Sequence, residues 1–179
     1  MAAYFLDTST VVKRYVLEMG TPWVQALTDR AAGHFLFVAR ITDVEMTAAL
    51  ARRRRLGSLS LAEAGRALAA FRQDLAQQYR IVEIAIPLLQ QASQLADRHV
   101  LRAYDAVQLA ATLEIHSADP SLMLISADGE LNAAATAEGV RSMIRTPIPD
   151  PPPLCTFWPL YEELLPRETA NPVHPGGSR

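Results

Sequence analysis

The sequence has one cysteine, no long apolar run and almost no excess of charge of either sign. Because Cys155 has no partner for an intramolecular disulfide, we expect a reducing compartment. The start carries no charged leader, and no stretch reaches the roughly 18 apolar residues of a membrane span, so we predict a cytoplasmic protein without a membrane anchor. Seventeen basic and nineteen acidic residues exclude the globally basic surface that drives non-specific binding to nucleic acids.

Proline is scarce in the first part of the chain and concentrated after it. Nine of the twelve prolines lie between Pro147 and Pro175. The composition therefore predicts one packed domain over residues 1–146, long enough for a sizeable core, and a proline-rich tail over 147–179. Within that tail, residues 154–165 are too rich in leucine and aromatic side chains for a free linker, so we predict that they dock on a folded surface.

Short apolar segments alternate with amphipathic ones along the first 146 residues. Strands are expected at residues 4–6, 35–38, 81–84, 122–125 and 140–144. Helices are expected at residues 11–19, 21–32, 42–57, 60–79, 87–99, 103–115 and 130–138. Because parallel strands need crossover connections, this alternation predicts an α/β fold with a short-stranded, mainly parallel sheet flanked by helices.

Capping signals mark three of the predicted helix starts. Thr21 precedes Pro22, a residue suited to the first helical position. The segments Thr42–Glu45 and Ser60–Glu63 both fit the capping-box pattern, in which the two end residues satisfy each other's backbone N–H groups.

Four acidic residues occupy the predicted strand-to-helix junctions, where ligands bind in open α/β sheets. They are Asp7, Glu45, Asp105 and Asp128. Each has a structural explanation: Asp7 and Asp128 as N-caps, Glu45 as part of a capping box, and Asp105 as a charge facing a helix dipole. Together, however, clustered carboxylates repel one another unless a cation neutralises them, and hard oxygen ligands suit Mg²⁺ or Mn²⁺.

The motifs around these acids carry a family resemblance. Leu6-Asp7-Thr8-Ser9, a glutamate in the helix from residue 42, Tyr104-Asp105-Ala106 and Ser126-Ala127-Asp128 occur in this order. Together they resemble a PIN-domain nuclease, and in particular the VapC-type ribonuclease toxins of bacterial toxin–antitoxin pairs. The resemblance covers about residues 2–145. It implies a PIN-like three-layer fold, and the tail is its main departure from the family.

The resemblance also implies a function, that of a metal-dependent endoribonuclease. Asp7 and Asp105 would be the most direct ligands of Mg²⁺ or Mn²⁺, with Glu45 and Asp128 binding through water or holding a second ion. A bound ion would activate water for attack on an RNA phosphodiester. Ser9 would orient Asp7 or a metal-bound water, or alternatively bond only to backbone. The implied partners are a small antitoxin and a second copy of the chain.

Basic residues near these acids are candidates for RNA contacts. Arg52 to Arg55 form one run, and Arg52 lies about 10 Å along the predicted helix from Glu45. Because only Arg52 and Arg55 share a helix face, we predict that these two, with Arg102, contact phosphates. The alternative is that the run simply places cations at a helix C-terminus.

Two further functions stay open on the sequence. One is a catalytically inactive PIN-like module that binds RNA or protein, and the other is an RNA-processing nuclease that is not a toxin. Retention of all four carboxylates argues against the inactive module, because without a cation only their repulsion would remain. Dinucleotide-binding, serine-hydrolase and zincin motifs are absent from the sequence.

Overall fold

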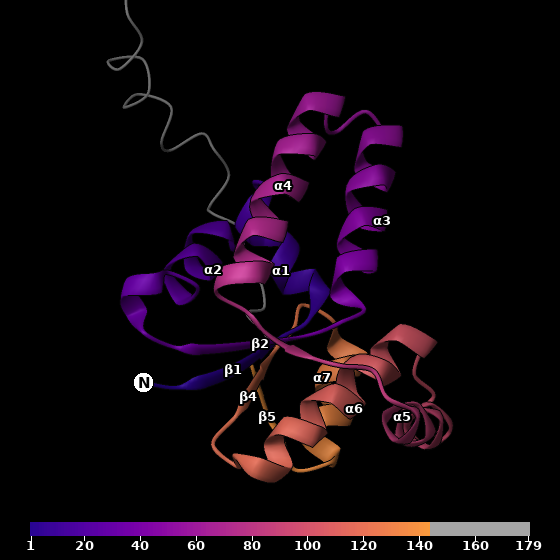
Figure 1. Ribbon diagram of the computed structural model, residues 1–179. Helices are drawn as coiled ribbons and strands as arrows, with labels where there is room; N and C mark the ends of the chain where they lie inside the picture. The colour runs from indigo at the N-terminus through magenta and orange to yellow at the C-terminus, as the bar shows by residue number, and fades with distance from the viewer. Residues whose placement is uncertain (144–179) are drawn as a thin grey trace, which may run out of the picture. The chain divides into compact units, whose positions relative to one another are not determined.

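The computed structural model describes residues 1–143 of the chain (Figure 1). The predicted boundary at residue 146, the proline-rich tail and its docking segment 154–165 lie outside the described residues and stay predictions. The strands are β1 (Ala3–Leu6), β2 (Phe35–Ala39), β3 (Arg80–Val82), β4 (Met123–Ile125) and β5 (Arg141–Met143). The helices are α1 (Thr8–Tyr15), α2 (Thr21–Leu27), the 3-10 helix η1 (Arg30–Ala32), α3 (Thr42–Arg55), α4 (Leu61–Gln77), α5 (Ile86–His99), α6 (Ala103–Ala118) and α7 (Gly129–Ala137).

The five strands form one parallel sheet in the order β3-β2-β1-β4-β5. β1 is central and pairs with β2 on one side and β4 on the other, with Phe5 opposite Phe37 and Leu124. Helices α1 to α4 lie on one side of the sheet and α5 to α7 on the other (Figure 1). The predicted three-layer α/β fold is therefore confirmed. No helix within residues 1–143 is long and apolar enough to cross a membrane.

Each face of the sheet has its own hydrophobic core, because successive side chains of a strand point to opposite faces. In β1, Phe5 is fully buried in the core shared with α5, α6 and α7. The next residue, Leu6, is fully buried in the other core, against α1, α3 and α4. Burial on both faces explains why β1, β2 and β4 are continuous apolar runs rather than alternating ones.

The helix starts confirm one capping prediction and correct another. Ser60 and Glu63 form the complete capping box at the start of α4. Thr21, in contrast, is not a cap: Gly20 is the N-cap of α2, in a left-handed conformation, and the buried Thr21 hydroxyl donates to the Val16 carbonyl. The helix predicted over 21–32 was also too long. It ends at Leu27, because Asp29 starts a separate 3-10 turn by capping the Ala31 N–H.

Candidate active site

The carboxyl edge of the sheet collects the ends of neighbouring strands, and the predicted acidic residues follow from it. Asp7 comes directly after β1, and Asp128 follows the adjacent strand β4. Glu45 lies in the first turn of α3, after β2, and Asp105 lies in the first turn of α6. These positions leave the acids close enough for their charges to interact: burial raises the pKa values of Glu45 and Asp105, and repulsion from neighbouring acids of this set raises them further.

Asp7 is a buried carboxylate, only 5 % exposed. Its Oδ2 accepts hydrogen bonds from the Ser9 hydroxyl at 2.5 Å, the Ser9 backbone N–H at 3.1 Å and the Ser126 hydroxyl at 3.0 Å. Burial raises the pKa of Asp7, although these hydrogen bonds act in the opposite direction. Asp7 is therefore the N-cap of α1 and also a carboxylate whose burial disfavours its charged form. The Ser9 hydroxyl fixes one of its two oxygens.

Asp128 lies in the same region, after the adjacent strands β1 and β4, and is linked to Asp7 through Ser126. Its Oδ1 caps α7 by accepting from the backbone N–H groups of Glu130 and Leu131, at 2.8 and 3.0 Å. The Ser126 hydroxyl, which donates to Asp7, accepts from the Asp128 N–H at 3.0 Å. The N-cap predictions for Asp7 and Asp128 are thus confirmed, but each cap uses one carboxylate oxygen and leaves the other for further chemistry.

The capping box predicted at Thr42–Glu45 is wrong. Ile41 is the N-cap of α3, and no side chain bonds there. The Glu45 Oε2 instead accepts from the Thr8 hydroxyl and the Gln108 Nε2, each at 2.6 Å. Burial raises the pKa of Glu45, and repulsion from Asp7 and Asp105 adds to the rise. The glutamate therefore turns away from its own helix terminus and toward the other acids.

Asp105 has the least compensated charge of the four. Burial raises its pKa, repulsion from Asp128 and Asp7 raises it further, and only the Arg102 guanidinium acts against them. Its Oδ2 is buried without a hydrogen-bond partner among residues 1–143. A buried carboxylate oxygen without a donor is costly. The atom is thus suited to an external donor or cation.

The donor set fits a hard divalent cation. Within residues 1–143, the hydrogen bonds described above go to Oδ2 of Asp7, Oε2 of Glu45 and Oδ1 of Asp128. All available ligands are carboxylate oxygens, the type that Mg²⁺ and Mn²⁺ take. In the described part of the chain no group of three or more acidic, histidine or cysteine side chains lies together in a way that could hold a metal ion. An ion would therefore have to draw the carboxylates together.

Sequence reasoning did not assign roles to three polar residues that hold the acids. These are Thr8, Gln108 and Ser126, all of them buried. For Gln108 a signal existed, because it is a single polar residue within the apolar stretch from Ala106 to Ala111 of α6. Such a residue needs a partner in the interior, but the sequence does not say which one.

The predicted RNA-contacting arginines lie on the surface. Arg52 and Arg55 are exposed in the last turn of α3, whereas the neighbouring Arg53 pairs with Glu18. Arg102 is exposed at the start of α6, close enough to Asp105 to lower its pKa. These positions permit the predicted contacts with phosphates, which stay predictions.

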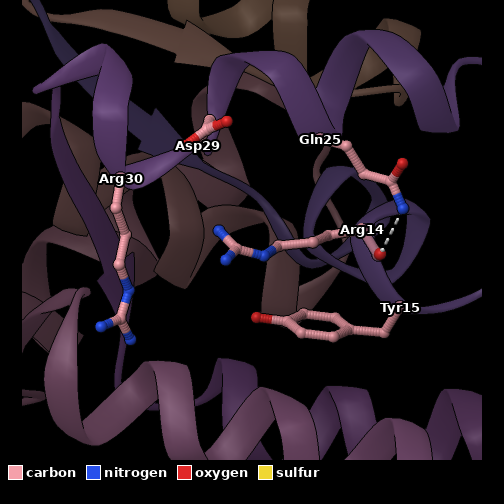
Figure 2. A pocket seen from close by; sticks show the side chains of 5 residues that line it. All are labelled: Arg14, Tyr15, Gln25, Asp29 and Arg30. Atoms are coloured by element: carbon pink, nitrogen blue, oxygen red, sulfur yellow. Dashed lines mark hydrogen bonds between the residues drawn. The ribbon is translucent and has the colours of Figure 1, made fainter.

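A separate pocket of about 370 Å³ lies at the other end of α1 (Figure 2). Its lining residues are Arg14, Tyr15, Gln25, Asp29 and Arg30. None of them belongs to the predicted site. The Gln25 amide donates to the Arg14 carbonyl at 3.2 Å.

A short parallel sheet between two helical layers, with four carboxylates following its carboxyl edge, is the arrangement that the resemblance to PIN-domain nucleases predicts. No protein-family model matches the sequence. The chain is 33 % identical over 141 residues to Ribonuclease VapC45 and to Ribonuclease VapC49, from two strains of Mycobacterium tuberculosis. The match covers 79 % of this chain and 94 % of each relative. The chain therefore belongs to the VapC ribonucleases.

Solved structures show the same fold. The structure of PAE2754 from Pyrobaculum aerophilum aligns with a TM-score of 0.56 and 20 % identity, over 79 % of this chain and 83 % of that one. VapBC2 from Rickettsia felis, solved with a DNA fragment from its promoter, aligns with a TM-score of 0.54 and 10 % identity, over 79 % of this chain and 98 % of that one. At these identities the likeness concerns the fold alone.

Proposed function

We propose that this chain is the ribonuclease toxin of a toxin–antitoxin pair and hydrolyses RNA phosphodiesters with the help of Mg²⁺ or Mn²⁺. Membership of the VapC ribonucleases supports the reaction class. The observation that carries the metal dependence is the buried, unpartnered Oδ2 of Asp105, beside acids that raise its pKa. A bound divalent cation would supply an activated water and neutralise charge on the phosphate.

The residues of the chain then have distinct tasks. Asp7 and Asp105 would hold the ion most directly, and Glu45 and Asp128 would bind through water or hold a second ion. Ser9 and Ser126 fix the Asp7 carboxylate by hydrogen bonds to its Oδ2. Arg102, Arg52 and Arg55 would contact phosphates of the RNA and set its path across the acids.

The reaction is tested by incubating the purified protein with a mixed RNA pool and Mn²⁺ or Mg²⁺. We expect cleavage that excess EDTA abolishes and that Asp7→Asn reduces by about 100-fold or more, since an ion ligand contributes several kcal/mol in the transition state. Asp119→Asn is the matched control, because Asp119 is a partly exposed aspartate at the far end of α6, where its carboxylate bonds only to Ser121 among the described residues. Cleavage that survives both EDTA and Asp7→Asn would reject the proposal in favour of an inactive binding module or a contaminating nuclease.

The partners are tested separately. The aligned VapBC structure supports a small antitoxin, which we expect to cover the acidic residues, and we further propose that the nuclease is a homodimer. Expression without the antitoxin should arrest growth, and Asp7→Asn should relieve the arrest. Unaffected growth together with cleavage in vitro would point to an RNA-processing nuclease instead of a toxin. Light scattering of the purified protein would show whether it is a dimer.

A further inference from the structure

Gln108 is a fully buried amide whose two ends differ. Its side chain is 0 % exposed in α6. The Nε2 lies 2.6 Å from Glu45 Oε2, 3.1 Å from Thr8 Oγ1 and 3.3 Å from Thr42 Oγ1, while the Oε1 is buried without a partner among residues 1–143. The described residues therefore bond only the NH₂ end of this amide, and all three acceptors lie beside or within the acidic site. An oxygen buried without a partner costs free energy, which the contacts of the NH₂ group must offset.

The chemistry of the partners fixes the direction of these bonds. An ionised Glu45 has no proton to give, so the amide atom at 2.6 Å must be the NH₂ group, and the Thr8 hydroxyl must donate to the same carboxylate. Thr8 Oγ1 is then free to accept from the Gln108 NH₂ group, which also donates toward Thr42 Oγ1. The three side chains close a ring of hydrogen bonds that joins α1, α3 and α6.

This ring holds one oxygen of Glu45 by two hydrogen bonds and leaves the other without one. Oε2 takes both donors, and no hydrogen bond within residues 1–143 engages Oε1. The donors come from the elements of the other acids, since Thr8 follows Asp7 directly and Gln108 lies one helical turn after Asp105. The position of Glu45 is thereby coupled to those of Asp7 and Asp105.

We propose that Gln108 is a positioning residue that, with Thr8, presents the Oε1 of Glu45 to the cation shared with Asp7 and Asp105. The inference rests on the proposed function and deepens it. A neutral amide suits this task, because a lysine or arginine at the same place would bring its own positive charge and compete with the ion. Outer partners of metal ligands typically affect metal affinity or activity by about 10–100-fold.

The main test replaces Gln108 by methionine, which keeps the length and approximate volume of the side chain and removes both N–H donors. We expect Gln108→Met to bind Mn²⁺ about 10-fold more weakly in calorimetric titrations of the RNA-free protein. Gln78→Met is a matched control. The Gln78 Nε2 also donates one hydrogen bond, to the Thr28 carbonyl at 2.7 Å, and its Oε1 is likewise buried and unpartnered within residues 1–143. Its Mn²⁺ affinity should equal that of the wild type.

A double-mutant cycle with Glu45→Gln separates positioning from a general effect on the fold. If Gln108 acts through Glu45, adding Gln108→Met to Glu45→Gln should weaken Mn²⁺ binding no further. Thr8→Ala removes the other donor to Oε2 and should reproduce the loss, and it serves as the test if Gln108→Met does not fold. Unchanged Mn²⁺ affinity in Gln108→Met or, failing that variant, in Thr8→Ala would overturn the inference, as would additive losses in the cycle. A wild type that neither binds Mn²⁺ nor cleaves RNA would instead overturn the proposed function.

Discussion

Within residues 1–143, the carboxylate of Asp74 and the four carboxylates of the acidic site are compensated in opposite ways. Asp74 in α4 is paired with Arg14 at 2.9 Å and Arg30 at 3.3 Å, and it accepts a hydrogen bond from the Tyr15 hydroxyl at 3.0 Å. Both arginines line the pocket of Figure 2. At the acidic site, none of the four carboxylates forms an ion pair within residues 1–143.

The difference separates a structural cluster from a functional one. Around Asp74 the chain supplies its own positive charge, so the folded state gains from the cluster without any ligand. Around Asp105 it supplies mainly like charge, which destabilises the folded state, and the cation proposed above would relieve that repulsion. Perturbed pKa values caused by burial and like charges are typical of functional sites.

Asp105→Asn should have the largest effect on activity of the changes proposed for the two carboxylate clusters. Loss of this carboxylate should reduce kcat/KM for RNA by about 100-fold or more, because several kcal/mol of transition-state stabilisation depend on the ion. The same change removes a repulsive charge, so the free energy of unfolding of the metal-free variant should exceed that of the wild type by about 1 kcal/mol or less. Its Tm should be slightly higher. Kinetics and thermal unfolding in EDTA measure the two effects. A lower Tm would mean that Asp105 stabilises the fold.

Asp74→Asn should have the opposite effects: a loss of stability with no loss of RNA cleavage. It leaves Arg14, which is largely buried, without its counter-charge and should destabilise the protein by about 2 kcal/mol, less than a fully buried pair would lose. RNA cleavage well below Tm should be unchanged. Urea unfolding and steady-state kinetics test this, with Glu83→Gln at the exposed Arg40–Glu83 pair as a control that should leave stability unaltered. A loss of cleavage without a loss of stability would contradict it.

The repulsion at the acidic site should also be visible in how the stability of the protein depends on pH. The raised pKa values of Asp7, Glu45 and Asp105 mean that the folded protein keeps these protons to higher pH than the unfolded chain does. Their contribution to the stability of the metal-free protein should therefore fall as pH rises from the ordinary carboxyl range through the raised values, and then level off. Mn²⁺ competes with the same protons, so its stabilising effect should grow over that interval.

Thermal unfolding with Mn²⁺ or EDTA at a series of pH values measures this effect. Other carboxylates act in the opposite direction: hydrogen bonds from His99 and Arg98 lower the pKa of Glu138, whose contribution is lost as pH falls. Subtracting the curve of Asp105→Asn removes that background. A Mn²⁺ effect that does not depend on pH would show that the ion displaces no protons from these acids.

The smallest effect is expected at the exposed arginines of α3. Arg52→Ala and Arg55→Ala should raise KM for RNA by a few fold and reduce the slope of log affinity against log salt by roughly 0.7 for each phosphate that is no longer neutralised. Arg53→Ala is the neighbouring control, because Arg53 pairs with Glu18 and should affect stability more than KM. Equal changes in KM for all three variants would show that only total charge matters.

Much of the fold follows from local patterns, and the exceptions have physical reasons. Each described strand was predicted within a residue or two, because runs such as Leu122 to Ile125 are apolar on both faces. The helix predicted over 21–32 was interrupted because Asp29 offers its carboxylate to the Ala31 N–H. The four acids were named from their junction positions, but the partners of Glu45 were misassigned to its own helix terminus.

The sequence by itself determined what is settled within about one helical turn: the alternation of strands and helices, the capping box of Ser60 and Glu63, and the caps formed by Asp7 and Asp128. Only the tertiary structure decided how the charges are compensated. Glu45 accepts from Thr8 and Gln108, which are 37 and 63 residues away in the chain. Local hydrogen bonds are encoded by near neighbours, whereas the partners of a carboxylate in the interior depend on which distant segments the sheet brings to its side.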